Sequence, residues 1–226
     1  MQNTSLTNLN LNRNELGELA GKALAVTLSL TNLDLRYNHK LGKSAGKALA
    51  EALRNNATLT NLNLGAIDLG ESVGKALTKT LCKNTTLTNL DLRQNWLGES
   101  VGKALAEVLC KNITLTNLNL FANDLVGESG KALANALCKN TTLTHLYLEY
   151  KCLDEAAGKV LAEALSKNTT LTNLNLKANN LEESVGKALA EALRKNTTLT
   201  DLNLGHNSWG KSVEKALADV CAKIPH

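Results

Sequence analysis

Leucines recur along the chain in one fixed pattern. The string L-T-x-L-x-L occurs eight times, with spacings of 24, 29, 28, 28, 28, 28 and 28 residues. Its first leucines are Leu6, Leu30, Leu59, Leu87, Leu115, Leu143, Leu171 and Leu199. Apolar and polar residues alternate near the end of each string, which predicts a short strand with one buried face.

The second half of each copy has the pattern of an amphipathic helix. Val73, Leu77 and Leu81 form one apolar stripe at four-residue spacing. Neither the strand nor the helix can bury its apolar side alone, whereas stacked copies share one long core. Strands stack ~4.8 Å apart and helices ~8–10 Å apart, so the stack must bend with the strands inside.

Polar residues and glycines at fixed helix positions complete the repeat. Glu71 and Ser72, like Glu99 and Ser100, fall in the first helical turn, where carboxylates and hydroxyl acceptors suit a helix N-terminus. A glycine precedes the helix lysine in seven copies, and close approach of the next helix is the simplest reason for its ~1 kcal/mol helix cost. The glycines are Gly21, Gly46, Gly74, Gly102, Gly130, Gly158 and Gly186.

The two ends of the chain differ from the middle. Glu214 replaces the repeated glycine in the eighth copy, where no helix follows. With Asp219, Lys223 and Pro225, it predicts a C-terminal cap. The first copy begins almost at once and is four residues short, so either it caps itself or an upstream segment is missing.

The front of each copy reads LxxLxLxxNxL, which resembles the leucine-rich repeat. The 28-residue period with a helical second half resembles the ribonuclease-inhibitor subfamily, over residues 6–224. The resemblance implies an α/β fold, a right-handed horseshoe-shaped solenoid with concave parallel strands and convex helices. We expect residues 1–226 to form a single domain of about eight repeats.

One asparagine column resembles the hydrogen-bonded ladder that links the turns in this family. It contains Asn14, Asn38, Asn95, Asn123, Asn179 and Asn207. Ile67 and Lys151 interrupt it, and a one-residue shift would place Cys152 in the second gap instead of a costly buried lysine.

The remaining chemistry is sparse. Three cysteines occupy one position of successive copies: Cys82, Cys110 and Cys138. Neighbouring helices are farther apart there than the ~7 Å limit between the Cα atoms of a disulfide. Cys221 falls in a core leucine column. The cysteines are therefore expected to be reduced. No zinc-type spacing, phosphate loop or nucleophile turn occurs, so we expect no metal, no cofactor and no enzyme activity.

Net charge and targeting signals limit the classes of partner and the cellular location that we expect. The net charge is +4 with a sequence pI near 8.7, but the repeated lysines, several with an acid four residues later as in Lys47 and Glu51, suit a solvated outer face. Neither nucleic acid nor a membrane is an expected partner, since there is no aromatic-lined basic groove and no ~20-residue apolar run. Without a signal peptide, six of the seven N-x-S/T sequons read as turn residues. The expected location is the cytoplasm or a host cytosol after delivery.

Variation between copies concentrates at the outward strand positions and the following turn. Five of the six aromatic residues fall there, and Trp209 alone occupies a core slot. Trp, Tyr and Arg are enriched in binding hot spots, so these columns predict a concave protein-binding face with its adjoining edge, against the alternative of neutral drift. The candidate residues are Arg36, Tyr37, Arg93, Trp96, Phe121, His145, Tyr147, Glu149, Tyr150 and Lys177.

The predicted function is a protein–protein interaction module that is monomeric when unbound. By resemblance to ribonuclease inhibitor, one specific form is an enzyme inhibitor that covers an active site, as in small bacterial effector proteins that regulate other effectors. Two alternatives remain open. One is a sensor or regulatory domain of a larger receptor, similar to the repeats of innate immune receptors. The other is a GTPase-activating protein of the Ran type, whose acidic tail is absent here.

Overall fold

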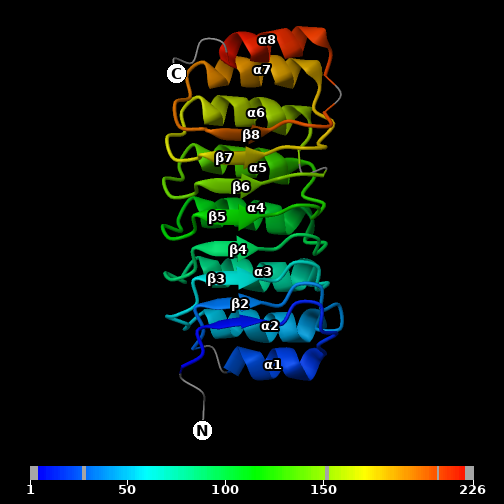
Figure 1. Cartoon of the computed structure of the whole chain (residues 1–226), viewed down its shortest axis with the longest axis vertical. Coiled ribbons are helices and arrows are strands. Elements are labelled where there is room, and N and C mark those ends of the chain that lie inside the picture. The colour runs from blue at the N-terminus through cyan, green and yellow to red at the C-terminus, as the bar shows by residue number, and fades with distance from the viewer. Residues whose placement is uncertain (1–4, 27–28, 151–152, 208, 222–226) are drawn as a thin grey trace.

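The computed structural model describes residues 5–26, 29–150, 153–207 and 209–221, in which eight strands and eight helices alternate (Figure 1). The strands are β1 (Asn8–Asn10), β2 (Asn32–Asp34), β3 (Asn61–Asn63), β4 (Asn89–Asp91), β5 (Asn117–Asn119), β6 (His145–Tyr147), β7 (Asn173–Asn175) and β8 (Asp201–Asn203). The helices are α1 (Glu18–Val26), α2 (Gly42–Leu53), α3 (Gly70–Leu81), α4 (Gly98–Leu109), α5 (Glu128–Leu137), α6 (Glu155–Leu165), α7 (Glu183–Leu193) and α8 (Lys211–Cys221).

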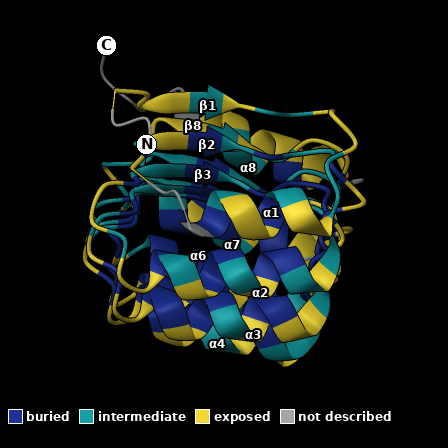
Figure 2. Ribbon diagram, turned by 90° about the horizontal axis from the view of Figure 1, so that it is seen from below, coloured by how far each residue is buried: buried dark blue, intermediate teal, exposed yellow. Residues whose placement is uncertain are grey.

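All eight strands form one parallel sheet in chain order from β1 to β8. Equivalent residues of successive repeats pair directly, as Leu90 does with Leu118. The helices cover one face of the sheet and leave the other open (Figure 2). The expected α/β leucine-rich-repeat solenoid is therefore confirmed.

The core is a column of leucines between the sheet and the helices. Leu90 and Leu118 point inward from their strands and are at most 2% exposed, while their polar strand neighbours are only partly covered. Val73, Leu77 and Leu81 supply the buried stripe of α3. The alternation in the strand and the four-residue spacing in the helix thus meet in one interior.

Buried asparagines link the repeats, as the family resemblance implied. Asn123 donates from Nδ2 to the carbonyls of Leu92 (2.8 Å) and Leu120 (3.1 Å), and its Oδ1 accepts from the N–H of Asn95 (3.0 Å). Ile67 fills the same slot in the third repeat and is fully buried. Lys151 and Cys152, the second interruption, lie outside the described residues.

A second asparagine column, at the end of each helix, also bridges repeats. Asn112 donates to the carbonyl of Leu81 in the preceding repeat (2.8 Å) and accepts from the N–H groups of Thr114 and Leu115. These asparagines belong to the repeated sequons, so their turn-forming role is confirmed. The bond to the preceding repeat adds a linkage that the sequence pattern alone did not indicate.

The helix glycines lie where the next helix comes closest. An added Cβ at Gly102 would lie 2.6 Å from Cβ of Ser129, and one at Gly74 would lie 2.7 Å from Cγ2 of Val101. Neither position has room for a methyl group, so close packing explains the glycine column. Glu214, which takes this position in α8, is exposed, and α8 is the last helix of the described residues.

Contacts on the helix surface add detail to the sequence pattern. Ser100, in the first turn of α4, donates its hydroxyl to Oε1 of Glu71 in the preceding repeat (2.6 Å). The helix lysines pair with the preceding glutamate rather than the following one, as Lys75 does with Glu71 (2.6 Å) and Lys103 with Glu99 (2.6 Å). Glutamate before lysine is the better orientation, because each charge then faces the favourable end of the helix dipole.

The first repeat is thinly covered and the described cysteines are reduced, as the sequence predicts. In the first repeat, Leu19 is 83% exposed, so coverage there is thin. Cys82, Cys110 and Cys138 are free thiols, whereas the side chain of Cys221 and residues Lys223 and Pro225 lie outside the described part. Within the described ranges, no helix has both the length and the apolar character needed to span a membrane.

Candidate functional site

The open face of the sheet is a polar groove. Each strand directs two side chains away from the core, and these are mostly asparagine or aspartate, such as Asn61 and Asn63 on β3. Over β1 to β6 they line a hollow of about 720 Å³. Of the ten candidate residues, Arg93, Tyr147 and Glu149 line this groove.

Six of the other seven candidates lie along the edge where the chain leaves each strand, whereas His145 is the first residue of β6. We call the second residue after each strand from β2 to β8 the exit row: Arg36, Gly65, Arg93, Phe121, Glu149, Lys177 and Gly205. The inter-repeat ladder continues here, since the carbonyl of Arg93 accepts from Ala66 N–H (2.9 Å) and that of Phe121 from Gln94 N–H (2.8 Å). Successive members of the exit row are therefore held at the strand separation of ~4.8 Å.

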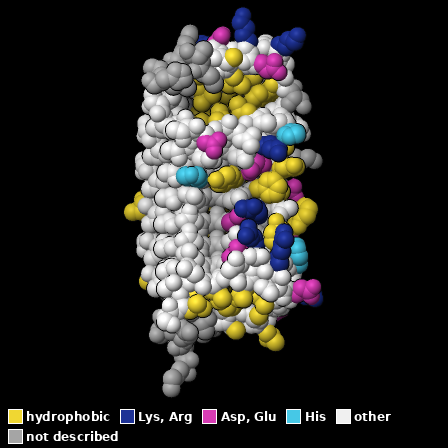
Figure 3. Space-filling model, in the orientation of Figure 1, with side chains coloured by type: hydrophobic (Ala, Val, Ile, Leu, Met, Phe, Trp, Pro, Cys, Tyr) yellow, Lys and Arg dark blue, Asp and Glu magenta, His cyan; other side chains and the backbone are white. Residues whose placement is uncertain are grey.

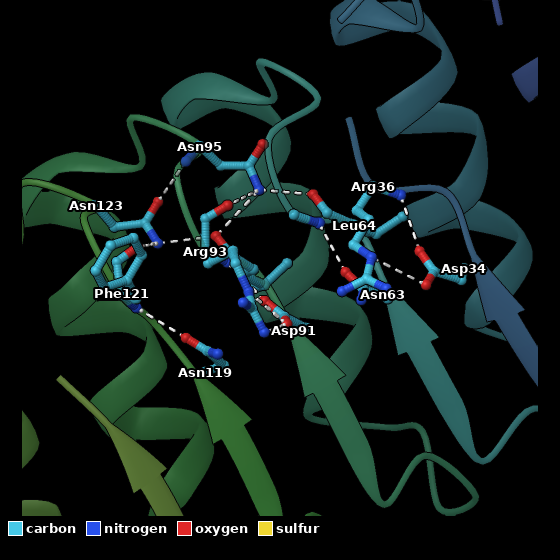
Figure 4. A network of polar contacts seen from close by, with 12 residues as sticks. Asp34, Arg36, Asn63, Leu64, Asp91, Arg93, Asn95, Asn119, Phe121 and Asn123 are labelled. Carbon is cyan, nitrogen blue, oxygen red and sulfur yellow. Dashed lines mark hydrogen bonds and ion pairs between the residues drawn. The ribbon is translucent and has the colours of Figure 1, made fainter. Parts of the chain in front are cut away.

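Aspartates fix the arginines of the exit row (Figure 4). Oδ1 of Asp91 accepts from the Arg93 N–H (3.0 Å) and its Oδ2 from Arg93 Nε (2.7 Å). In the second repeat, Asp34 holds the Arg36 N–H in the same way (3.1 Å), and Arg36 Nε lies 3.2 Å from its Oδ2. The hydrogen bond that Arg93 donates to Asp91 raises the pKa of Arg93, so this guanidinium stays charged.

The next position, the turn row, has a left-handed backbone throughout. Its members have φ between +52° and +60°: Tyr37, Ala66, Gln94, Ala122, Tyr150, Ala178 and His206. Two residues later a second left-handed position follows in several repeats, where Asp68, Asp124 and Asn180 have φ near +55°. Trp96 stands in that second column with φ +55°. Aspartate and asparagine tolerate this conformation, but a bulky aromatic residue is strained in it.

Apolar side chains gather on this edge beside β4 to β6 (Figure 3). The rings of Phe121 and Tyr150 meet edge to face, with centroids 5.0 Å apart. Trp96 is 67% exposed, and Tyr150 and Val126 are each 49% exposed. We call Trp96, Phe121, Val126 and Tyr150 the apolar edge cluster. Its members come from three consecutive repeats, and Phe121 and Tyr150 connect the last two of them by ring contact.

Val126 was not among the candidates read from the sequence. The fifth repeat reads LVGES where the third and fourth repeats read LGESV, so one valine has moved from the core to the surface. Ser129 takes the vacated core position, fully buried, and its hydroxyl donates to the carbonyl of Val126 (2.9 Å). Aligning the fifth repeat with its neighbours residue by residue would have revealed this exchange.

The sixth repeat departs from the others at both outward strand positions. His145 and Tyr147 replace asparagine or aspartate, and His145 Nδ1 lies 2.9 Å from Oγ1 of Thr144. Glu149 accepts a hydrogen bond from Nδ2 of Asn175 (2.5 Å). Burial raises the pKa of Glu149, although the positive charges of Arg93 and Lys177 oppose that shift.

The last candidates lie at the two ends of the edge. Tyr37 is half-buried, and the guanidinium carbon of Arg13 stands 4.7 Å from its ring centroid. Lys177 continues the exit row next to Glu149. The structure thus places eight of the ten candidates along one edge, from Arg36 to Lys177, whereas His145 and Tyr147 lie on β6 itself. Among the described residues, no group of three or more His, Cys, Asp or Glu side chains could hold a metal ion.

Comparisons with known proteins agree with this architecture. A family profile described as Leucine Rich repeat matches residues 2–25, 28–50, 83–106 and 195–208. With the eight stacked strand–helix repeats, these matches support a leucine-rich-repeat fold of the ribonuclease-inhibitor-like type. No curated protein sequence matches it.

Two solved structures are similar to this chain at low sequence identity. The tropomodulin C-terminal domain of Caenorhabditis elegans is 16% identical, with a TM-score of 0.52 over 74% of this chain and 86% of that one. The structure titled Leiomodin-1 Actin-Binding Site 2 is 20% identical, with a TM-score of 0.47 over 77% of this chain and 86% of that one.

Proposed function

We propose that the protein is a binding module that binds a partner protein with the polar groove and with the edge beside it. We call this edge, which consists of the exit row, the turn row and the apolar edge cluster, the exit edge. Repeat solenoids use extended surfaces of this kind for binding. The apolar edge cluster supplies the anchors, and the arginines and Glu149 set the orientation of the partner. This role requires no catalytic group, which fits the absence of a nucleophile turn or phosphate loop from the sequence.

The observation that carries the proposal is Trp96. It is 67% exposed and has a left-handed backbone, in a column where Asp68 and Asp124 satisfy the same turn. The fold gains nothing from a tryptophan here and pays conformational strain of the order of 1 kcal/mol. Strained, exposed aromatic residues are typical of sites kept for binding.

Steric inhibition of an enzyme is the specific form of binding that we propose. The groove is built on hydrogen-bonded strands and asparagine ladders, so little conformational entropy is lost when a partner docks. A rigid arc that surrounds a convex partner blocks access to any active site beneath it. The partner's turnover therefore falls in proportion to the fraction bound.

Affinity capture with quantitative mass spectrometry tests the proposal. The bait pair is the wild type and the triple variant Phe121→Ala, Tyr147→Ala, Tyr150→Ala. A matched control carries Lys75→Ala, Lys103→Ala and Lys187→Ala on the helix side. We expect one protein to be captured by wild type and control but at least tenfold less by the triple variant. Equal capture by all three would place binding elsewhere and contradict the proposal.

Assay of the captured protein separates inhibition from simple binding. If it is an enzyme, the wild-type chain should lower its activity at a stoichiometry of one to one, and the triple variant should not. Full activity of the saturated complex would leave the binding module intact and refute inhibition.

A further inference from the structure

The asparagines on the groove side of the sheet are held by one end only. We call the third residue of each strand the groove row: Asn10, Asp34, Asn63, Asp91, Asn119, Tyr147, Asn175 and Asn203. Its first six members line the hollow. Oδ1 of Asn63 accepts from the Gly65 N–H (3.1 Å), and Oδ1 of Asn119 accepts from the Phe121 N–H (3.0 Å) (Figure 4). Because a backbone N–H can only donate, the oxygen is the fixed atom of each amide, and Nδ2 is the atom left for a ligand.

Three of these Nδ2 groups are donors without an acceptor. In the described part of the chain, Nδ2 of Asn63 and Nδ2 of Asn119 donate to no protein group. The same holds for Asn10, whose Oδ1 accepts from the Asn12 N–H (3.1 Å). The groove row therefore presents a free donor on β1, on β3 and on β5.

The carboxylates between these asparagines are already engaged. Asp91 accepts from the backbone N–H and from Nε of Arg93. Asp34 accepts from the Arg36 N–H, and its Oδ2 lies 3.2 Å from Nε of the same arginine. Each carboxylate is thus neutralised by an arginine of its own turn. From β1 to β5 the groove row offers donors while its acceptors are occupied, so a matching ligand carries accessible acceptors and needs neither charge nor donors. A prolyl residue is such a group, because it has a carbonyl and no N–H.

The spacing of the free donors indicates the conformation of the ligand. The donors lie on alternate strands, so neighbouring donors are two strand separations apart, about 9.6 Å. A polyproline II helix completes one turn of three residues in about 9.3 Å and leaves its carbonyls free, so one carbonyl per turn can meet each donor. In an extended strand, carbonyls on one side recur about every 6.8 Å, and the carbonyls of an α-helix are bonded within the helix. Among these three conformations, polyproline II fits the row.

We propose that the groove binds a proline-rich segment of the partner protein, in the polyproline II conformation and laid along the solenoid axis from β1 to β6. Carbonyls three residues apart accept from Nδ2 of Asn10, Asn63 and Asn119. Beyond the third carbonyl, a proline ring packs on the half-buried Tyr147, the next member of the groove row. Proline-rich segments use aromatic side chains in this way in other grooves. This inference rests on the proposed function and adds the composition and conformation of the segment that docks.

A labelled peptide tests the inference on the full chain. The probe is dodecaproline with a terminal fluorescein, which is a polyproline II helix in water. The control peptide carries the same label on twelve alternating glycine and serine residues, a flexible chain of equal length. Cellohexaose, a neutral sugar with many hydroxyl acceptors, serves as an unlabelled competitor. Fluorescence anisotropy measures binding at low and at high salt.

We expect saturable binding of dodecaproline that is at least tenfold tighter than that of the glycine–serine peptide, because the proline helix is already ordered. Binding should change less than twofold between low and high salt, because the ligand carries no charge in the groove. Cellohexaose should not displace the peptide.

A matched pair of double variants assigns the donors. Asn63→Asp with Asn119→Asp keeps the oxygen that the turn requires, as aspartate does elsewhere in the groove row, and replaces each free donor by an acceptor. It should bind dodecaproline at least tenfold more weakly, with an unchanged circular dichroism spectrum. Asn61→Asp with Asn117→Asp makes the same charge change at the first position of the same two strands. It should bind dodecaproline within twofold of the wild type.

Tyr147 provides a second reading that does not change the charge of the groove. Tyr147→Ala should weaken the binding of dodecaproline at least fivefold, and Tyr147→Phe, which keeps the ring, should bind within twofold of the wild type.

Equal binding of the two peptides, no saturation by dodecaproline, or equal binding by the two double variants would overturn the inference. Displacement of the peptide by cellohexaose would also overturn it and would make a sugar the ligand of the groove row. If dodecaproline fails while capture of the natural partner still depends on Phe121, Tyr147 and Tyr150, the proposed function survives and only the proline-rich occupant is wrong.

Discussion

At two repeated positions, this protein holds residues that the local backbone conformation disfavours. Packing explains the residue at the first position and does not explain the one at the second. On the helices, glycine occupies a position such as Gly102 where alanine would be the better helix former, and Ser129 of the next helix explains it. On the exit edge, Trp96 and Tyr150 occupy left-handed turns where asparagine or glycine would cost less. No close packing explains Trp96, since two thirds of it is exposed.

The contrast separates residues that the fold requires from residues that the fold merely tolerates. A change in the glycine column should damage stability, and a change in the edge column should damage binding while leaving stability intact or improved. Each prediction below tests one side of this difference, from the largest expected effect to the smallest.

The largest effect is expected inside the framework. Asn123→Ala removes four side-chain hydrogen bonds: those that Nδ2 donates to the carbonyls of Leu92, Leu120 and Phe121, and the one that Oδ1 accepts from the N–H of Asn95. Because each such bond contributes ~0.5–1.5 kcal/mol net, the free energy of unfolding should fall by about 3 kcal/mol in urea titrations. Asn32→Ala, an exposed strand position, is the control and should change it by less than ~0.5 kcal/mol. Similar values for both would refute the ladder's structural role.

The second effect tests the contact between helices. Gly102→Ala should lower the free energy of unfolding by about 1–3 kcal/mol, because Cβ of Ser129 cannot rotate away from the new methyl group. Glu214→Ala, in the same column but without a following helix, should be neutral within ~0.5 kcal/mol. If Gly102→Ala proved stabilising, helix propensity would outweigh packing, and the explanation of the glycine column would fail.

The third effect is an increase in the free energy of unfolding. Trp96→Asp installs the residue that Asp68 and Asp124 provide at equivalent left-handed turns. The free energy of unfolding should rise by about 0.5–1 kcal/mol as the strain is relieved. Partner binding, measured by calorimetry on the same sample, should weaken at least tenfold. Loss of stability would show that Trp96 packs for the fold, and the contrast between the two columns would disappear.

The smallest effect concerns Glu149, whose pKa is raised by burial. Since the unfolded chain releases this proton first, stability should decline as pH rises from about 4.5 through the folded pKa. Glu149→Gln can still accept the hydrogen bond from Asn175 and removes that decline. The melting temperatures of the two proteins should be closest below pH 4 and favour the variant at pH 7. A constant difference across this range would contradict the raised pKa.

Most of the fold could be predicted because its determinants are local and repeated. The leucine spacing specified the strand and helix of each repeat, and glycine placement indicated how closely the helices approach, as Gly74 and Val101 show. Details that depend on rotamers could not be predicted. Lys75 has acidic and polar neighbours on its helix and across repeats, and only the structure shows that it pairs with Glu71.

The candidate site was less accessible to sequence reasoning. Comparison of the copies found the exposed aromatic residues, but it could not show that Phe121 and Tyr150 stack or that Trp96 is strained. Those facts depend on three-dimensional contacts and on the left-handed turns. Val126 was missed because its repeat keeps the same composition and changes only the order of five residues.

The most direct test of the account is amide hydrogen exchange of the chain with and without its captured partner. The account predicts that added protection concentrates in residues 34–38, 91–97, 119–127 and 145–150, on the groove and the exit edge. The outer helices, for example residues 103–109, should exchange at the same rate in both states. Protection confined to the helices, with none at the exit edge, would contradict the central claim.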